Sequence, residues 1–380
     1  MTTTTKSKPA RRGATTVLAA TLAAAIRAVA PAVSTRHSTG GRVYLGERVE
    51  ATDGELRITV ATPVSDQAVL VPHAKVAAIL GTVSGDVRLQ PEASLLRVSA
   101  SRGQWSLPTE QAEEWPTAAE GDLRPFARFP ADEFSRAVRA VIDAADTESS
   151  RYALGGVLLE HKGPHVAFVA TDGRRLNCCV VDIDQDTDDG SVIVPARVMH
   201  VLLRVAEAAG DEALQLCVVG NREIVAEVGD TVVRAALLDG RFPRWLDVIP
   251  ADVRPAFGED DTTYREPPAH VEVSAGDLLS CVRQAAIVTS EQSKGVQFTF
   301  TTDGLMLSGR SAEFGESTVT ADLAVAGIAC SVKLDPAFVA SWLRQVDTAA
   351  MVEVYATDAE SAVVMRHEDC YSVVMPLAAD

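Results

Sequence analysis

The chain has 380 residues, with 52 acidic against 35 basic side chains, a formal charge of −17 and 47% apolar positions. This length exceeds one ordinary core and predicts two to four domains at roughly 100 to 200 residues each. The apolar fraction excludes global disorder, no stretch reaches the roughly 18 uninterrupted apolar residues of a membrane helix, and the acidic balance argues against phosphate binding unless basic residues gather locally.

The N-terminal segment 1–13 is basic and rich in threonine, and it lacks apolar periodicity. It is predicted to be a disordered tail, either simply solvated or touching phosphates through Lys6, Lys8, Arg11 and Arg12. The following run, 14–26, resembles a secretory signal, yet apolar residues recur there at helical spacing, at Leu18, Leu22, Ile26 and Val29. That spacing favours a helix over about 17–30 in an ordinary domain.

An internal repeat then organises the chain. Three segments share an apolar strand end, a proline and a short amphipathic run: 69–76, 192–198 and 332–339, with the prolines Pro72, Pro195 and Pro336. Proline suits the first turn of a helix, where its missing N–H costs nothing, so each one predicts a strand-to-helix junction.

A second amphipathic helix is predicted upstream of each proline, over about 17–30, 131–145 and 275–288. Acidic Asp132 and Glu133 suit a helix N-terminus, and Ser274 is the expected N-cap of the third. Apolar or alternating stretches predict strands at 156–160, 165–170, 213–219, 296–300 and 351–355. The predicted fold is α+β: three copies of one unit, each with two helices and roughly six to eight strands.

Proline-rich, charged linkers near 116–130 and 250–269 divide these copies. The predicted domains are 14–118, 128–250 and 268–380, after the tail. The first copy is predicted to be short, because Thr62 lies much closer to Pro72 than Thr171 does to Pro195 or Ser311 to Pro336. About one strand and a turn are therefore expected to be missing from the first domain.

The six cysteines form no C-x-x-C pair, and no histidine lies at zinc-ligand spacing. In a chain this long, that pattern argues against a structural metal and a disulfide framework and fits a reducing cytosol, so we expect a cytoplasmic protein. No Walker, H-E-x-x-H, G-x-S-x-G or S-x-x-K motif occurs, and the seven histidines are scattered. We therefore expect no catalytic residue, cofactor or metal.

An aspartate-rich run, 182–190, begins like a calcium loop. It has Thr187 where the loop needs glycine and Ile193 where it needs the bidentate glutamate. An acidic surface loop is the interpretation.

Several motifs together resemble the bacterial DNA polymerase III β subunits, the sliding-clamp family. They are R-Y-A-L-G-G-V (151–157), V-A-T-D-G-R-R-L (169–176), L-D-G-R-F-P (238–243) with V-I-P (248–250), A-A-I-V-T-S (285–290), K-G-V (294–296) and Y-S-V-V-M-P-L (371–377). The resemblance is dense from about 130 onward and weak before that.

The resemblance implies a head-to-tail homodimer of three-domain subunits, a closed ring with helices lining a central hole. Duplex DNA would thread this hole and be held through its phosphates without base readout. The predicted helices lean basic, which fits such a lining. The expected channel residues are Arg27, Lys75, Arg136, Arg139, Arg197, Arg204, Arg283 and Arg344.

The resemblance also implies an apolar pocket between the second and third domains that takes a short peptide from polymerases, the clamp loader and repair proteins. Its matched positions are Leu154, Thr171, Gly173, Arg174, Arg175, Leu176, Pro243, Asp247, Val248, Val373, Met375, Pro376 and Leu377, with Ala362 assigned more loosely. Arg174 stands where the family has histidine, and Asp247 stands where it has a basic residue. A negative charge at the rim is expected to alter which peptides bind.

The family's dimer seam pairs an edge strand of the first domain with the third domain. Here Trp105 and Leu107 alternate on one strand beside Arg102, and aromatic residues are enriched at interface cores. Their implied counterparts are Ile287, Val288, Glu313 and Glu316.

The function implied is a non-catalytic processivity factor that tethers the polymerase to duplex DNA. Two alternatives stay open at this point. One is a divergent clamp paralogue with altered ring closure or partner choice, and the other is a monomeric partner-binding or enzyme-like protein on the same scaffold.

Overall fold

The computed structural model describes residues 14–118, 121–147, 152–183, 188–250, 253–255, 257, 269–290, 294–321, 325–327 and 329–378. The predicted tail 1–13, the centre of the aspartate-rich run and most of the 250–269 linker lie outside these residues. Within the described part of the chain, no helix combines the length and the apolar character needed to cross a membrane.

The order of elements repeats three times. The first copy runs β1 (Thr15–Leu18), α1 (Ala19–Val29), β2 (Arg42–Leu45), β3 (Val49–Thr52), β4 (Leu56–Val60), β5 (Val69–Pro72), α2 (His73–Leu80), β6 (Asp86–Pro91), β7 (Leu95–Ala100) and β8 (Gly103–Pro108), followed by short β9 (Glu110–Gln111). The second runs β10 (Leu123–Pro130), α3 (Ala131–Ile142), β11 (Gly156–Lys162), β12 (His165–Thr171), β13 (Arg175–Asp182), β14 (Gly190–Pro195), α4 (Ala196–Ala209), β15 (Ala213–Val219), β16 (Glu223–Val228) and β17 (Thr231–Ala236). The third runs β18 (Ala269–Ser274), α5 (Ala275–Ala285), β19 (Val296–Thr301), β20 (Gly304–Ser311), β21 (Gly315–Ala321), β22 (Val325–Gly327), β23 (Cys330–Leu334), α6 (Pro336–Leu343), β24 (Met351–Ala356), β25 (Val363–His367) and β26 (Cys370–Val374). The predicted threefold repeat is confirmed.

The predicted helix starts are also confirmed. Pro72 and Pro195 are the residues before α2 and α4, whereas Pro336 is the first residue of α6. Ser274 caps α5, since its hydroxyl accepts a hydrogen bond from the Asp277 N–H at 3.1 Å. The last predicted turn of that helix is a 3₁₀ turn, η6 (Ala286–Val288).

The expectation of a missing strand in the first copy is wrong. Four strands connect the two helices of that copy, as in the second, but β2, β3 and β4 have 4, 4 and 5 residues where β11, β12 and β13 have 7, 7 and 8. Thr62 follows β4, whereas Thr171 ends β12, so the two spacings compared different strands. The first copy therefore has the same number of strands between its helices, but these strands are shorter.

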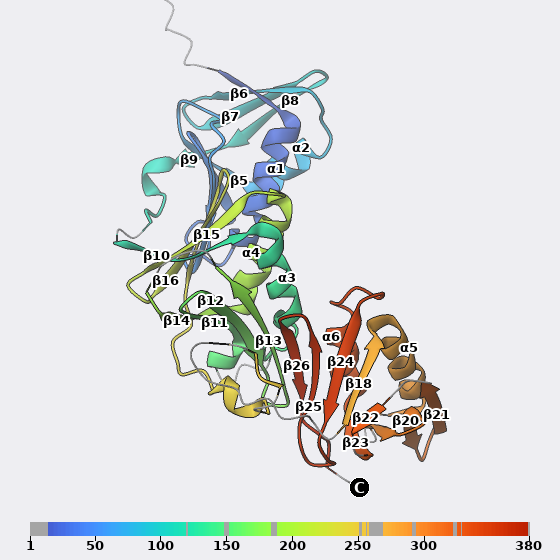
Figure 1. Cartoon of the computed structure of the whole chain (residues 1–380). Coiled ribbons are helices and arrows are strands. Elements are labelled where there is room, and N and C mark those ends of the chain that lie inside the picture. Colours follow the sequence, from blue (N-terminus) through green and yellow to red (C-terminus); the bar gives the residue numbers. More distant parts are fainter. Residues whose placement is uncertain are drawn as a thin grey trace, which may run out of the picture. The chain divides into compact units, whose positions relative to one another are not determined.

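The described structure divides into two compact units, 1–124 with 214–236 and 125–213 with 237–380. In the first unit, one sheet has the order β1-β6-β7-β8, and strands of a second follow the order β15-β16-β17-β4-β3-β2-β5-β9. Strands β6, β7 and β8 of the first sheet are labelled near the blue end of the chain in Figure 1. Helices α1 and α2 contact each other, and α1 buries Leu22, Ile26 and Val29. These three predicted helical positions therefore face the core. Leu18, the fourth, ends β1 before the helix and is 57% exposed, so that part of the prediction is wrong.

A buried carboxylate on β3 ties this unit together. The Glu50 side chain is only 4% exposed; it accepts hydrogen bonds from Trp115 Nε1 at 2.6 Å and Arg48 Nε at 2.8 Å, and it pairs with Arg57. Burial alone would raise the pKa of Glu50, but the hydrogen bonds from Arg48 and Trp115 and the charges of Arg57 and Arg48 outweigh it and lower the pKa below its ordinary value.

Replacing Glu50 with glutamine should destabilise the protein by about 2 kcal/mol near neutral pH, because it weakens a buried charge-assisted network. A group with a lowered folded pKa stabilises the fold above its unfolded pKa, and this contribution is lost as the pH falls through the folded value. The gap between parent and E50Q should therefore shrink below about pH 4. Urea unfolding at several pH values measures this gap. Glu47→Gln, at a side chain 77% exposed, is the matched control and should change little.

The second unit contains a nine-stranded sheet of order β14-β11-β12-β13-β26-β25-β24-β18-β22 and a four-stranded sheet of order β21-β20-β19-β23. Helices α3 and α4 contact each other, as do α5 and α6. Phe129, Phe134 and Phe168 form a triangle of tilted and edge-on rings under α3, with centroids 5.5 to 5.8 Å apart. The β13–β26 pair joins the second copy of the repeat to the third.

Candidate protein-binding and DNA-binding sites

The strand pair β13–β26 organises the predicted peptide site. Its antiparallel register places Arg175 opposite Val374 and Leu176 opposite Val373. Beyond β26, the Met375 N–H donates to the Arg174 carbonyl at 2.9 Å, and the Leu377 N–H donates to the Lys333 carbonyl at 2.8 Å. The C-terminal segment is thus fixed beside the start of β13, so two predicted pocket segments far apart in sequence lie together.

The turn between β12 and β13 explains why the sequence T-D-G-R-R occurs there. The Thr171 hydroxyl donates to the Arg175 carbonyl at 2.6 Å and accepts from the Gly173 N–H at 3.0 Å. Asp172 accepts from the N–H groups of Arg174 and Arg175 at 2.9 and 3.0 Å. Gly173 has φ +85°, which favours glycine. The turn is locally determined by these side chains.

A buried apolar cluster underlies the site. It includes Leu176 and Val373 together with Trp245 and Ile249, and half-buried Ala362 packs against it. Trp245 opens the 3₁₀ turn η4 (Trp245–Val248), which also carries Asp247 and Val248. Trp245 Nε1 donates to Glu160 Oε2 at 2.7 Å. The third predicted pocket segment is therefore anchored to the same core as the other two.

The predicted pocket residues differ in their exposure. Leu154, Thr171, Leu176 and Val373 are buried. Met375 is 43% exposed and Val248 44% exposed, and Pro243, Gly173 and Arg174 are also exposed, while Pro376 and Leu377 are half-buried. The exposed members are the ones that could contact a peptide directly, and the buried members support them.

Helix α6 contributes two residues that the sequence analysis missed. The guanidinium of Arg175 lies over the Phe338 ring at 4.6 Å from its centroid, and Arg174 lies at 5.6 Å. Arg175 also donates to the Ser341 hydroxyl at 2.8 Å and pairs with Asp172 at 3.2 Å. The only signal in the sequence was the position of these residues on the helix after Pro336, which lies far from Arg175 along the chain.

The expected negative charge at the rim is partly compensated. Asp247 forms an ion pair with Arg244 at 3.0 Å, with both side chains more than half exposed. An exposed pair contributes little to stability, but it offsets the local charge of the Asp247 carboxylate.

The predicted DNA-contacting residues lie on or beside helices. Arg27 and Lys75 of the first unit are exposed on α1 and α2. In the second unit Arg139, Arg197, Arg204, Arg283 and Arg344 are exposed, and Arg344 directly follows α6.

Two of these arginines already have acidic partners. Arg139 pairs with Glu207 of α4, and Arg136 is half-buried, 3.8 Å from Glu368. Arg204 donates to the His200 carbonyl at 3.2 Å, which leaves its charge uncompensated by that contact. The structure describes the helices of each unit separately, so a single basic face over both units stays a prediction.

The predicted dimer residues lie at two sheet edges. Strand β8 is the edge of its sheet; it carries Leu107, 8% exposed, and half-buried Trp105, whose ring covers Gly103. In the second unit β21 is an edge, Ile287 on η6 is 76% exposed, and Val288 beside it is half-buried.

Charged and aromatic side chains accompany these edges. Arg102 and Glu313 are exposed, and Glu316 pairs with Arg310 at 3.0 Å. Phe314, at the β20–β21 turn, is 56% exposed and was missed by the sequence analysis. Exposed bulky apolar residues beside an unpaired strand edge mark a surface suited to association.

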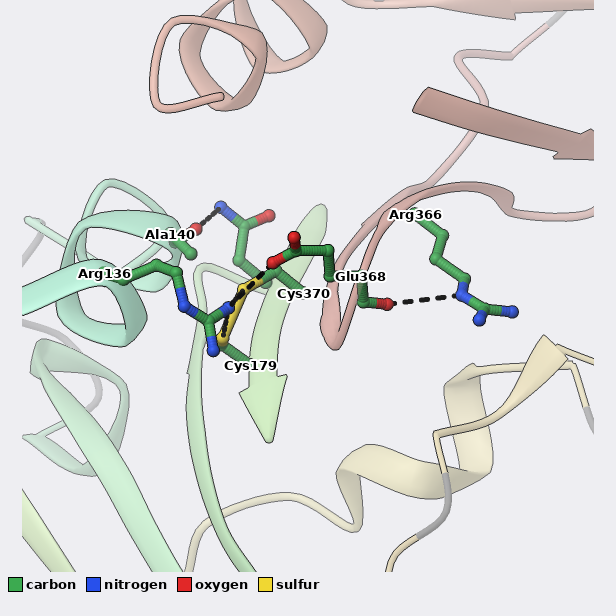
Figure 2. Close-up of a disulfide and its surroundings, with 7 residues drawn as sticks. Arg136, Ala140, Cys179, Arg366, Glu368 and Cys370 are labelled. Carbon is green, nitrogen blue, oxygen red and sulfur yellow. Dashed lines mark hydrogen bonds and ion pairs between the residues drawn. A yellow bond between two sulfur atoms is a disulfide. The ribbon is translucent and has the colours of Figure 1, made fainter. Parts of the chain in front are cut away.

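The cysteines differ from the expectation that none would pair. Cys179 and Cys370 form a disulfide, although 191 residues separate them in sequence (Figure 2). They become neighbours because β13 and β26 pair, which cysteine spacing cannot reveal. Cys178, Cys217, Cys281 and Cys330 are free, and burial raises the pKa of the Cys178 thiol. No cluster suited to a metal ion occurs among the residues that the structure describes.

Comparisons with known proteins agree with one another. Residues 128–244 match the sequence profile of the DNA polymerase III beta subunit, central domain. The chain is similar to the beta sliding clamp of Escherichia coli K12, with 27% identity over 326 residues and 84% of each chain covered, and to that of Haemophilus influenzae, with 25% identity over 338 residues covering 87% and 88%.

Solved structures share the fold. A sliding clamp from Pseudomonas aeruginosa bound to griselimycin superposes with a TM-score of 0.86 at 24% identity, over 96% of this chain and 99% of that one. The clamp from Bacillus subtilis gives a TM-score of 0.85 at 16% identity, over 97% and 99%.

Proposed function

We propose, from the premise that this chain belongs to the family of bacterial DNA polymerase III β subunits, that it is a sliding clamp, a processivity factor that encircles duplex DNA and tethers the polymerase. Such a protein catalyses no reaction. It acts by keeping the polymerase at a high effective concentration near the primer end. Its proposed location is the cytoplasm.

The observation that supports a ring is a repeated pattern of strand pairing between copies. In the first unit β4, the strand before the proline-linked strand of copy one, pairs with β17, the last strand of copy two. In the second unit β13, the equivalent strand of copy two, pairs with β26, the last strand of copy three. Two equivalent strands are left as edges, β21 of copy three and β8 of copy one.

Pairing β21 of one chain with β8 of another would repeat the same junction. This contact is head-to-tail, and such contacts close into a ring when the rotation between subunits allows it. We propose a homodimer whose six domains, 14–118, 128–250 and 268–380 of each chain, close in this way. Antiparallel strand addition at an exposed edge supplies main-chain hydrogen bonds.

Side chains beside the two edges suit this contact. Ile287, Val288 and Phe314 would meet the face of β8 that carries Trp105 and Leu107. Arg102 is positively charged on the β8 side, while Glu313 and Glu316 are negatively charged on the β21 side. Opposite charges at a rim favour the correct register of association.

The helices supply the proposed DNA contact. Exposed arginines and lysine on α1 to α6 would form a basic lining in a protein whose formal charge is −17. Charged groups that meet only phosphates hold duplex DNA without reading its sequence, so the ring could slide.

The surface around Met375 is the proposed binding site for short peptides of polymerases and the clamp loader. Exposed Met375, Val248 and Pro243 supply apolar contact area, and methionine adapts to different partners. The arginines at 174 and 175 and Phe338 border it.

Two features of the chain bear on the divergent-paralogue alternative. A divergent paralogue was suggested by a missing strand, which is present, and by the charge of Asp247, which Arg244 offsets. The monomeric alternative predicts a monomer at micromolar concentration, whereas the ring predicts a dimer. The mass in solution distinguishes the two.

Retention on circular DNA tests the proposal. The chain should be loaded onto a nicked plasmid by a clamp loader and then isolated at high salt, where electrostatic binding without topological linkage is lost. Most of the loaded protein should remain on the circle, and cutting the plasmid once should release it within minutes. Equal retention on circular and linear DNA would count against a ring. The control for effects of the nuclease itself is a reaction in which the nuclease cuts only a second, free plasmid, and the loaded protein should then stay on its intact circle.

A further inference from the structure

We propose that Cys179 and Cys370 form a redox-modifiable lock that covalently joins the second and third copies of the repeat and that a dithiol reductant opens. The two residues face each other at one end of the β13–β26 ladder, with a Cα–Cα distance of 4.0 Å. Antiparallel partners at such close separation bring their side chains together without a change in the backbone.

Side chains alternate between the two faces of the sheet along β13, so Cys179 faces Cys370 and its neighbour Cys178 does not. Cys178 points to the opposite face of the sheet and packs in the apolar cluster with Leu176 and Trp245. Its thiol therefore cannot exchange with the disulfide while the strand is in place. Cys178 lies opposite Tyr371, so Cys179 and Cys370 are the two cysteines that face each other across this ladder.

A cation lies against the two sulfur atoms. Arg136 Nη1 of α3 is 3.2 Å from Cys370 Sγ and 3.5 Å from Cys179 Sγ, and Glu368 lies 3.8 Å from the same nitrogen (Figure 2). Asn177 donates to the Ala140 carbonyl at 3.1 Å and holds α3 onto β13. A guanidinium at this position stabilises a thiolate, which is both the attacking and the leaving species in thiol–disulfide exchange.

The hairpin between β25 and β26 gives access to the bond. Cys370 is the first residue of β26, directly after the turn formed by Glu368 and Asp369, and it is 5% exposed, whereas Cys179 is fully buried. The Arg136 side chain above them is 40% exposed. A small dithiol would therefore reach Cys370 first.

The exchange then proceeds in two balanced steps. A thiolate of the dithiol attacks Cys370 Sγ, the bond between the two sulfurs breaks, and Cys179 leaves as a thiolate beside Arg136. The second thiolate of the reductant then attacks the reductant's other sulfur, which is bonded to Cys370 in the mixed disulfide, and Cys370 leaves as a thiolate. The dithiol is oxidised to a cyclic disulfide, and the two protein thiolates take up two protons. An oxidised small-molecule disulfide reverses the reaction.

The lock bears on peptide binding, and this part rests on the proposed function. The same ladder that ends at the disulfide carries Leu176 opposite Val373 and continues into Met375. Fixing the register of these strands preorganises the peptide surface, which lowers the ordering cost of binding. Opening the lock should weaken peptide affinity by roughly two- to fivefold.

Thiol counting tests the lock without reference to function. The full-length protein is equilibrated with an excess of oxidised glutathione, repurified, unfolded without reductant and titrated with a thiol reagent. Four thiols should react, against all six after treatment with dithiothreitol. Six thiols in the oxidised sample would overturn the proposal. A disulfide that peptide mapping assigns to other cysteines would overturn it equally.

Thermal unfolding and a peptide titration complete the test. Reduction should lower the melting temperature by roughly 5 °C, and the double variant C179S/C370S should lose this response. Cys217→Ser is the matched control and should keep it. An unchanged melting temperature in the parent would contradict the lock. Equal peptide affinity in both redox states would contradict the coupling of the disulfide to the peptide site. No peptide binding in either state would contradict the proposed function. The thiol count and the melting shift would then still test the lock.

Discussion

Replacing both Met375 and Leu377 with alanine is expected to weaken binding of a clamp-binding peptide by at least about 100-fold while the protein remains folded. The segment that carries them is held by main-chain hydrogen bonds to Arg174 and Lys333, which alanine preserves. The double substitution therefore removes apolar contact area from a positioned backbone. Loss of two central anchors costs a peptide several kcal/mol, because few residues supply most of the affinity.

A fluorescence anisotropy titration with a labelled clamp-binding peptide from a polymerase measures this effect. Met351→Ala is the matched control, since Met351 on β24 is 47% exposed and lies outside the proposed site. It should bind with the affinity of the parent. The assignment of the site would be wrong if the double variant bound as tightly as the control, provided both have the parent's melting temperature.

Replacing Ile287 with aspartate is expected to dissociate the proposed dimer. Ile287 is 76% exposed, so the substitution should leave the isolated chain folded. In the dimer the aspartate would be buried against the strand bearing Trp105 and Leu107 without a partner for its charge. An unpaired buried charge costs several kcal/mol. The dimer dissociation constant should rise by about 100-fold or more.

Light scattering after size exclusion, over a range of concentrations, measures the change in mass. Leu123→Asp, at an apolar side chain 46% exposed on β10, is the control and should not shift the equilibrium. A parent protein that is monomeric at micromolar concentration would contradict the ring and favour the monomeric alternative. A dimer unaffected by I287D would place the interface elsewhere. The same variant should also lose its retention on circular DNA.

Local chemistry accounts for what the sequence analysis predicted well. Proline before a short amphipathic run predicts a helix start because it acts through its own ring and missing N–H, and Ser274 caps α5 through a hydrogen bond three residues away. The turn at 171–175 is likewise built from neighbouring side chains. Because each of these signals is short-range, each was readable in the sequence, and together they predicted the threefold repeat.

The contacts that the sequence analysis missed are between residues far apart in the chain. The missing strand in the first copy was a wrong inference, because the spacing to the proline was measured from β4 in the first copy and from β12 in the second, which are not equivalent strands. Phe338 and Ser341 reach Arg175 only through the packing of α6 against the β13–β26 region.

The sequence by itself determined the repeated α+β unit, the helix starts and the resemblance to a known family, since these depend on periodicity and on motifs of a few residues. Only the tertiary structure decided which strands pair between copies, and hence that Cys179 meets Cys370 and that β8 and β21 are left as edges. Strand pairing is set by the burial of whole sheet faces and by hydrogen bonds between segments far apart in the chain. That free energy is shared by many residues, so no single spacing in the sequence carries it.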